Sequence, residues 1–228
     1  MNLIDACIDN GVKRVVALST DKASSPANLY GASKLASDKL FIAGNSYSSR
    51  QGTKFAVVRY GNVMGSRGSV IPYFLSQVST GVLPITDPRM TRFMITLEEA
   101  VSFVRECIGL MRGGEIFVPK LPSFKVEDVA KAINANYKFK YIGVRPGEKI
   151  HEELIGSYEA MNTFDRGSYY IIVAQNYEDS YLKYKINEFK KVEKNFSLDS
   201  LKNKKYLSIR NIKNLIKGII KKNNQINY

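Results

Sequence analysis

One segment near the start of the chain combines an apolar strand, a polar turn and a helix. Residues 14–19 (RVVALS) are β-branched and apolar, which predicts a short buried strand. Thr20-Asp21-Lys22 follows directly, and Ser24-Ser25-Pro26 then supplies the hydroxyls and the proline that typically begin a helix. On that helix Tyr30 and Lys34 are four residues apart, so they share a face. Because reacting groups gather at strand ends in open α/β sheets, the segment predicts an α/β protein with a site here.

The residue types in this segment suit acid–base chemistry. A lysine ammonium beside a phenol favours the phenolate, which would make Tyr30 a usable general base with Lys34 as its partner. A bare Tyr-x3-Lys pair also occurs on ordinary amphipathic surface helices. The pair gains weight here because the polar Thr20-Asp21-Lys22 turn stands directly before it.

Thr20-Asp21-Lys22 with Tyr30-Gly31-Ala32-Ser33-Lys34 resembles the active-site segment of the extended short-chain dehydrogenase/reductase superfamily. Within that superfamily, the chain most resembles the inverting UDP-N-acetylglucosamine 4,6-dehydratases that open the pseudaminic acid pathway. Further segments agree in the same order, and together the match covers residues 1–175. Those segments are 58–70 (VRYGNVMGSRGSV), 83–93 (LPITDPRMTRF), 114–120 (GEIFVPK) and 144–149 (VRPGEK).

For the complete enzyme, the resemblance implies an internal redox dehydration with NADP as cofactor. Tyr30, assisted by Lys34, would take the proton from the sugar 4-hydroxyl, and both residues would also contact the cofactor. Lys22 would be the base at C5, Asp21 would protonate the departing 6-hydroxyl, and Thr20 would orient the 4-oxygen. The tyrosine at position 30 favours the inverting type, because retaining relatives typically carry methionine there.

The resemblance also implies a set of residues that bind the UDP-sugar. Arg92 and Arg145 would take the diphosphate, because a guanidinium binds phosphate through two parallel hydrogen bonds, and Glu148 would take the ribose hydroxyls. Each of these charged residues has a plain alternative as a surface salt-bridge partner. The further candidates for the same pocket are Asn62, Ser69 and Val70.

The Gly-rich turn by which the superfamily holds its cofactor does not occur in this sequence. Gly61-x3-Gly65-x2-Gly68 follows the wrong strand and carries Arg67, so it is interpreted as a substrate-side loop. The chain opens on residues 2–7 (NLIDAC), which the resemblance places within a helix before the family's fourth or fifth strand. We therefore expect an N-terminally truncated fragment. The alternatives are a catalytically inactive remnant, a sugar-nucleotide-binding module or a related sugar-nucleotide epimerase.

The formal net charge of +13 is concentrated near the end of the chain. Residues 177–228 contain thirteen Lys and Arg against five Asp and Glu, and residues 206–220 have amphipathic helical spacing. We expect a solvated helix there; binding to an anionic surface is the alternative. Because no basic recognition motif interleaved with aromatic residues is present, nucleic acid is not expected as a partner.

Several other classes of site are disfavoured by the composition. His151 is the only histidine, so neither a Ser-His-Asp triad nor a His-rich metal site is expected, and its plain interpretation is a helix cap. Cys7 and Cys107 suggest no disulfide framework. The longest apolar stretch, 169–174, is far shorter than the roughly 20 residues of a membrane span. We expect a cytoplasmic protein without membrane partners, and the resemblance implies a homo-oligomer.

The expected fold class is α/β, with a partial Rossmann-like parallel sheet and a smaller mixed substrate-binding lobe. Residues 1–65 would be the C-terminal part of the dinucleotide-binding domain, 66–176 mainly the lobe, and 177–228 a basic tail with helices. A loop and a helix are expected around 66–80, followed by a polar stretch up to Thr96. The main elements expected elsewhere are helices at 2–9, 27–43, 97–110 and 125–135 and strands at 54–61, 115–118 and 169–174.

Overall fold

The computed structural model describes residues 1–48, 52–173 and 189–226, and the chain divides into two compact units. The first unit comprises 1–60, 98–120 and 153–199, and the second comprises 61–97, 121–152 and 200–228. Neither unit is a continuous stretch of sequence. In the first, strands from later segments hydrogen-bond onto the strand pair of the first 60 residues, so that pair is completed by residues far along the chain.

The first unit is built on a six-stranded sheet in the order β1-β2-β6-β11-β10-β12. The first three strands are parallel, and each of the other three runs antiparallel to its neighbour. Their bounds are β1 Arg14–Thr20, β2 Lys54–Tyr60, β6 Glu115–Pro119, β11 Tyr169–Val173, β10 Thr163–Asp165 and β12 Lys190–Lys191. Thr20 is opposite Tyr60 in the register, so the carboxyl ends of β1 and β2 lie together. The expected α/β class with a parallel core is confirmed.

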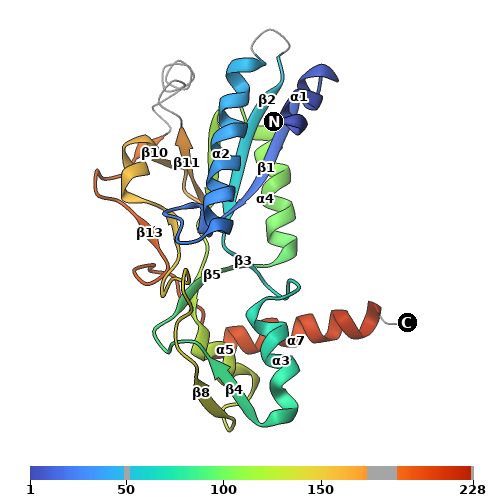
Figure 1. Ribbon diagram of the computed structural model, residues 1–228, viewed down its shortest axis with the longest axis vertical. Coiled ribbons are helices and arrows are strands. Elements are labelled where there is room, and N and C mark those ends of the chain that lie inside the picture. Colours follow the sequence, from blue (N-terminus) through green and yellow to red (C-terminus); the bar gives the residue numbers. More distant parts are fainter. Residues whose placement is uncertain (49–51, 174–188, 227–228) are drawn as a thin grey trace. The chain divides into compact units, whose positions relative to one another are not determined.

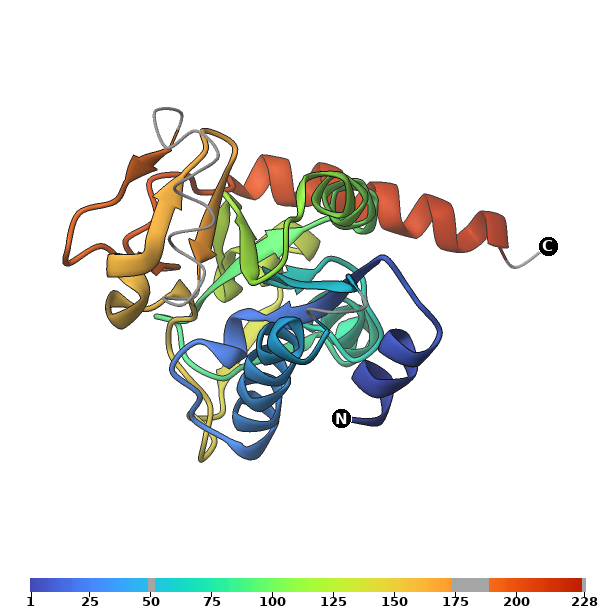
Figure 2. The ribbon, with the colours of Figure 1, turned by 90° about the horizontal axis from the view of Figure 1, so that it is seen from above.

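Helices cover both faces of this sheet (Figures 1 and 2). Successive side chains of a strand point to opposite faces, and β2 is apolar on both. Phe55 packs against Phe41 of α2 (Leu29–Tyr47), with 6.1 Å between ring centroids. Ala56 and Val58, on the other face, share a buried cluster with Cys107 of α4 (Leu97–Leu110). Among the described residues of this unit, a further helix, α1, spans Asn2–Asp9.

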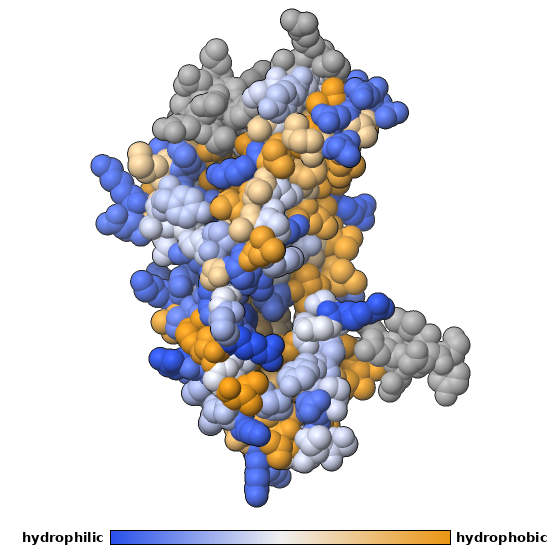
Figure 3. Space-filling view, viewed as in Figure 1, coloured by the Kyte–Doolittle hydropathy of each residue, from blue (hydrophilic) through white to orange (hydrophobic). Residues whose placement is uncertain are grey.

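Strand β1 is less buried than its sequence predicts. Of its seven residues only Ser19 is buried, and Leu18 is half-exposed. The reason is its place in the sheet, since β1 pairs with β2 alone among the described strands. Val101 and Ile108 of α4 are also exposed, and apolar side chains gather on the surface over α4 (Figure 3).

Four short elements complete the first unit around the end of β1. The 3₁₀ turn η1 (Asp21–Ala23) follows β1 without a break. Strand β9 (Glu153–Ile155) pairs with β13 (Leu198–Asp199), and the 3₁₀ helix η3 (Ser157–Asn162) follows β9.

The second unit contains two small sheets and three α-helices. Strand β5 pairs with β3 in parallel and with β7 antiparallel, and β4 pairs with β8 in parallel. The bounds are β3 Asn62–Val63, β4 Val82–Ile85, β5 Thr91–Ile95, β7 Ser123–Lys125, β8 Lys138–Tyr141, α3 Val70–Gln77, η2 Val78–Thr80, α5 Val126–Ile133 and α7 Ile209–Ile226. The stretch up to Thr96, which was expected to be polar, instead contains β4 and β5, and every residue of β5 is buried.

The C-terminal helix α7 belongs to the core of the second unit. Ile212 and Ile216 are buried in one cluster with Phe74 of α3 and Val129 of α5. The expectation of a solvated helix is therefore wrong for the face of α7 that carries Ile212 and Ile216. These isoleucines are one turn apart and form an apolar stripe. Within the described part of the chain, no helix is long and apolar enough to cross a bilayer.

Candidate active site

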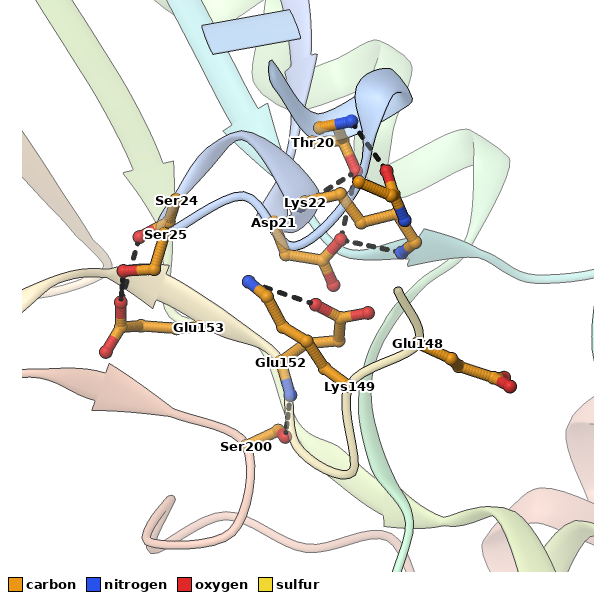
Figure 4. Close-up of polar contacts among 12 residues, drawn as sticks. Thr20, Asp21, Lys22, Ser24, Ser25, Glu148, Lys149, Glu152, Glu153 and Ser200 are labelled. Carbon is orange, nitrogen blue, oxygen red and sulfur yellow. Dashed lines mark hydrogen bonds and ion pairs between the residues drawn. The ribbon is translucent and has the colours of Figure 1, made fainter. Parts of the chain in front are cut away.

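The turn that follows β1 holds the predicted acid–base pair in one hydrogen-bonded group (Figure 4). Thr20 Oγ1 accepts a hydrogen bond from the Lys22 amide at 3.4 Å and donates one to Asp21 Oδ1 at 2.9 Å. Lys22 Nζ lies 3.0 Å from the same carboxylate oxygen. Asp21 is fully buried, whereas the Lys22 side chain is 33% exposed. The structure therefore brings together all three residues predicted for this turn.

One oxygen of the buried Asp21 carboxyl has no protein partner. Asp21 Oδ2 is inaccessible to solvent and makes no hydrogen bond within the described residues. An unsatisfied buried polar atom costs about 1–3 kcal/mol, so such atoms are rare outside functional sites. A ligand hydroxyl is the natural group to satisfy Oδ2.

Helix α2 carries the predicted tyrosine and lysine at its first turns. Asn28 caps the helix by accepting a hydrogen bond from the Gly31 amide at 2.9 Å. The Tyr30 ring is half-exposed, and Lys34 Nζ donates to the Leu18 carbonyl of β1 at 2.7 Å. Burial raises the pKa of Tyr60, and the nearby Tyr30 phenolate charge raises it further. The Tyr30 hydroxyl therefore lies near the end of β2, and the Lys34 ammonium lies near the end of β1.

Gly31 is a site residue whose importance sequence reasoning missed. A Cβ at this position would overlap the carbonyl oxygen of Lys22 and lie 3.0 Å from Pro26 Cβ. Only glycine allows the first turn of α2 to approach the turn of Asp21–Ala23 this closely. Its place directly after Tyr30 was the available signal.

The loop between the turn and α2 is held by hydrogen bonds to an acidic residue that was not predicted from the sequence. Ser24 Oγ and Ser25 Oγ donate to Glu153 Oε1 at 3.1 and 2.8 Å (Figure 4). Ser25 has a φ of 47°, the only positive value for a non-glycine residue in the described ranges. Glu153 comes from β9, about 130 positions later in the chain, so no local pattern links it to this loop.

A buried ion cluster lies directly behind the end of β1. Arg59, which is fully buried, contacts both oxygens of Glu159 at 3.0 and 2.9 Å and Asp38 Oδ2 at 3.4 Å. Ser19 Oγ donates to the same Asp38 oxygen at 2.8 Å. Burial raises the pKa of Asp38, an effect that Arg59 and Ser19 offset only in part. Burial alone would lower the pKa of Arg59, but the two carboxylates, Glu159 foremost, raise it above its ordinary value.

In the second unit, two of the predicted binding residues carry unsatisfied buried atoms. Asn62 Oδ1 in β3 and Ser69 Oγ have no hydrogen-bond partner within the described residues. Ser69 is the N-cap residue of α3, yet its hydroxyl does not cap the helix, and Val70 is the first helical residue. These atoms and the first amides of α3 are suited to bind polar or anionic groups of a ligand.

The predicted arginines differ in how far they are engaged. Arg92 is nearly buried, and its guanidinium donates to the carbonyls of Thr91, Lys149 and Ile150 at 2.8–3.0 Å. Glu148 and Glu152 lie 3.9 and 3.8 Å from it. Arg145 is exposed, and its amide donates to Glu148 Oε2 at 3.4 Å. The diphosphate and ribose contacts of these residues stay predictions.

His151 does not cap a helix, so that expectation is wrong. The residue lies in an irregular segment, with Nδ1 2.8 Å from the Thr91 hydroxyl. The Thr91 hydroxyl is also 2.7 Å from Ser200 Oγ, which accepts from the Glu152 amide at 2.9 Å (Figure 4). Ser200 thus joins the start of the C-terminal segment to β5 inside the second unit.

The parallel strands β1, β2 and β6, with a Tyr-x3-Lys helix that follows β1, are typical of the short-chain dehydrogenase/reductase class of Rossmann-type proteins. The chain belongs to the polysaccharide biosynthesis protein family, whose model matches residues 1–174. The superfamily resemblance found in the sequence is thereby confirmed.

Similar proteins share most of this chain. Two sequences from Campylobacter jejuni, both named UDP-N-acetylglucosamine 4,6-dehydratase (inverting), are 56% identical over 173 residues and 47% identical over 222. They cover 75% and 94% of this chain. A Rickettsia akari sequence named UDP-glucose 4-epimerase is 42% identical over 84% of this chain and 58% of its own length. The X-ray structure of Pen from Bacillus thuringiensis matches 95% of this chain and 66% of its own, with a TM-score of 0.84 and 34% identity.

The chain spans 52% and 66% of the two Campylobacter jejuni relatives. Alignments with one of them and with the solved structure extend into the C-terminal segment, where α7 packs into the core. The basic tail is thus shared with relatives.

Proposed function

We propose that the protein is a C5-inverting UDP-N-acetylglucosamine 4,6-dehydratase that uses NADP and forms a 4-keto-6-deoxy sugar nucleotide for pseudaminic acid synthesis. The observation that carries the proposal is the Asp21–Lys22 pair at the end of β1, in which Asp21 is buried and has one unsatisfied carboxyl oxygen. The names of the Campylobacter jejuni relatives support the same reaction. A 4-epimerase needs neither an acid nor a base for chemistry at C5 and C6.

The residues at the two strand ends fit the nicotinamide half of the cofactor. The Lys34 ammonium donates one hydrogen bond to the Leu18 carbonyl. Its other two protons can donate to the ribose hydroxyls of the cofactor. The half-exposed Tyr30 phenol lies one helical turn away. When bound, the nicotinamide supplies a reversible hydride acceptor for C4 and a hydride donor for C6.

In the first step Tyr30 takes the proton of the 4-hydroxyl, which leaves C4 ready to lose hydride and become a ketone. Lys34, one helical turn away, is assigned as the partner of Tyr30 in this step. Thr20 orients the 4-oxygen. The ketone at C4 then acidifies the hydrogen at C5, which is otherwise too weak an acid to be removed.

In the second step the Asp21–Lys22 pair removes water. In this step Lys22 acts as a neutral amine and Asp21 as a carboxylic acid. The Lys22 amine takes the C5 proton. Asp21 protonates the departing 6-hydroxyl from its otherwise unsatisfied oxygen, Oδ2. The bound cofactor would supply the hydride for C6, and a proton added to C5 on the face opposite Lys22 inverts that centre. The protons balance. One is taken from O4 and one from C5, and one is given to the departing hydroxide and one to C5.

The second unit supplies the groups for the nucleotide. Asn62 Oδ1 and Ser69 Oγ are unsatisfied, and Ser69 and Val70 begin a helix whose first amides suit a phosphate. Arg145 is exposed, so its guanidinium can reach a diphosphate without breaking an existing core contact. We assign Arg92 and Glu148 to the same nucleotide, and we expect the complete enzyme to be a homo-oligomer.

Product analysis tests this proposal. The protein, expressed from its natural gene, is incubated with UDP-N-acetylglucosamine and NADP, and carbon NMR follows C4 and C6. We expect a 4-ketone with a methyl group at C6 and loss of activity in Tyr30→Phe. A product that keeps oxygen at C6 with its C4 centre inverted would indicate the epimerase. Turnover unaffected by Tyr30→Phe would sink the assignment.

A further inference from the structure

The buried cluster of Ser19, Asp38, Arg59 and Glu159, here called the Asp38 cluster, has no part in the proton transfers described above. It connects four elements of the first unit, and Glu159 belongs to η3. Asp38 is on α2, Ser19 is the penultimate residue of β1, and Arg59 is opposite Ser19 in β2. All four side chains are at most 5% exposed. The cluster therefore joins the helix that carries Tyr30 to the strand end that carries the Asp21–Lys22 pair.

Helical periodicity places Asp38 on the catalytic face of α2. Tyr30, Lys34 and Asp38 follow one another at intervals of four residues, so they lie in one row along the helix. Two of the three bind β1 directly. Lys34 donates to the Leu18 carbonyl at 2.7 Å, and Asp38 accepts from Ser19 Oγ at 2.8 Å. These two bonds, on consecutive residues of β1, fix how α2 is set along the strand.

Neutralising Arg59 does not by itself explain why Asp38 is present. Glu159 already binds Arg59 through both carboxylate oxygens at 3.0 and 2.9 Å, which balances one charge with another. A second buried carboxylate adds a desolvation cost, which appears as the raised pKa of Asp38. A geometric function gives that cost a reason, because Asp38 alone in the cluster reaches from α2 to β1 and β2.

We propose that Asp38 is a positioning residue, which sets Tyr30 and Lys34 at a fixed distance from Thr20, Asp21 and Lys22 through Ser19 and Arg59. This inference rests on the proposed function, since it concerns the geometry of that reaction. Asp38 touches no reacting atom. It determines where the residues that act in the oxidation at C4, on α2, lie relative to the residues of the turn that act in the elimination of water.

Steady-state kinetics with a graded set of variants tests the proposal. Asp38→Ala removes the bonds to Ser19 and Arg59, and we expect kcat to fall about 100-fold, as for a misplacement of about 1 Å. KM for UDP-N-acetylglucosamine stays within about twofold, because the proposed nucleotide contacts are in the second unit. Asp38→Asn restores much of kcat, since its amide oxygen still accepts from Ser19. Ser19→Ala, a smaller deletion, lowers kcat about tenfold. The matched control is Asp9→Asn, on exposed α1, with unchanged kcat.

Hydrogen exchange gives a readout that does not depend on the reaction. Asp38→Ala should speed amide exchange in peptides that cover residues 17–23 and 29–38, while peptides of the second unit exchange at the wild-type rate. If the wild-type protein shows no turnover, the proposed function fails and the exchange experiment still decides whether Asp38 sets this geometry. Wild-type kcat in Asp38→Ala would overturn the proposal. So would an increase in exchange spread evenly over the chain, or a loss of kcat that Asp38→Asn does not lessen.

Discussion

Replacing Gly31 by alanine tests whether stability and the proposed activity require close contact between α2 and the turn of Asp21–Ala23. The new Cβ would overlap the Lys22 carbonyl oxygen, a backbone atom that cannot rotate away, and would press on Pro26 Cβ at 3.0 Å. Overpacking of this kind costs about 1–3 kcal/mol, whereas alanine in place of glycine gains up to about 1 kcal/mol of helix propensity. With the full propensity gain, we therefore expect a net loss of up to about 2 kcal/mol in the free energy of unfolding. Because the displaced carbonyl belongs to the proposed C5 base, kcat should fall about 100-fold.

The matched control is Gly218→Ala in α7. A Cβ at Gly218 meets no atom within 4 Å, so only the propensity term applies, and the variant should gain about 1 kcal/mol with unchanged kcat. Urea denaturation followed by circular dichroism measures both stabilities, and initial rates measure kcat. A Gly31→Ala protein as stable as Gly218→Ala, with wild-type kcat, would refute the reasoning about this contact.

Three further substitutions probe the core, the tail and the response to pH. Arg59→Met leaves two buried carboxylates without their cation and should lower the free energy of unfolding by about 3–5 kcal/mol in urea titrations; a loss below about 1 kcal/mol would contradict this. Ile216→Ala should lower the free energy of unfolding by about 2–5 kcal/mol, because the side chain is buried in the core of the second unit. An unchanged free energy of unfolding would contradict the placement of α7 in that core. Hydrogen bonds from Arg89 lower the pKa of Asp87 to about 2, so its stabilising contribution is present above pH 3.8 and is lost as the pH falls towards 2. Asp87→Asn should flatten the dependence of melting temperature on pH in that window, and an unchanged slope would count against the pair.

The predictable part of the site is the part that is contiguous in sequence. Thr20, Asp21 and Lys22 directly follow an apolar strand, and Tyr30 and Lys34 are one helical turn apart, so short-range patterns were enough to bring them together. Helix α4 was predicted at its observed bounds for the same reason.

The parts that escaped prediction depend on partners far away in the chain. Arg59 is 21 positions from Asp38 and 100 from Glu159, and an isolated arginine in an apolar strand gives no sign of either carboxylate. Strand β5 was missed because Thr91 and Arg92 make it look polar. Both side chains are satisfied by tertiary contacts with residues 148–152 and 200.

The division of labour between Asp21 and Lys22 is the central claim, and deuterium at C5 reports on it. Asp21→Asn and Lys22→Met are incubated with UDP-N-acetylglucosamine and NADP in D2O, and proton NMR follows the recovered substrate and any product. If Lys22 is the C5 base and Asp21 the acid for the 6-hydroxyl, Asp21→Asn exchanges C5 for deuterium without losing water, whereas Lys22→Met does neither. Exchange at C5 that persists in Lys22→Met, or elimination that survives in Asp21→Asn, would contradict the mechanism.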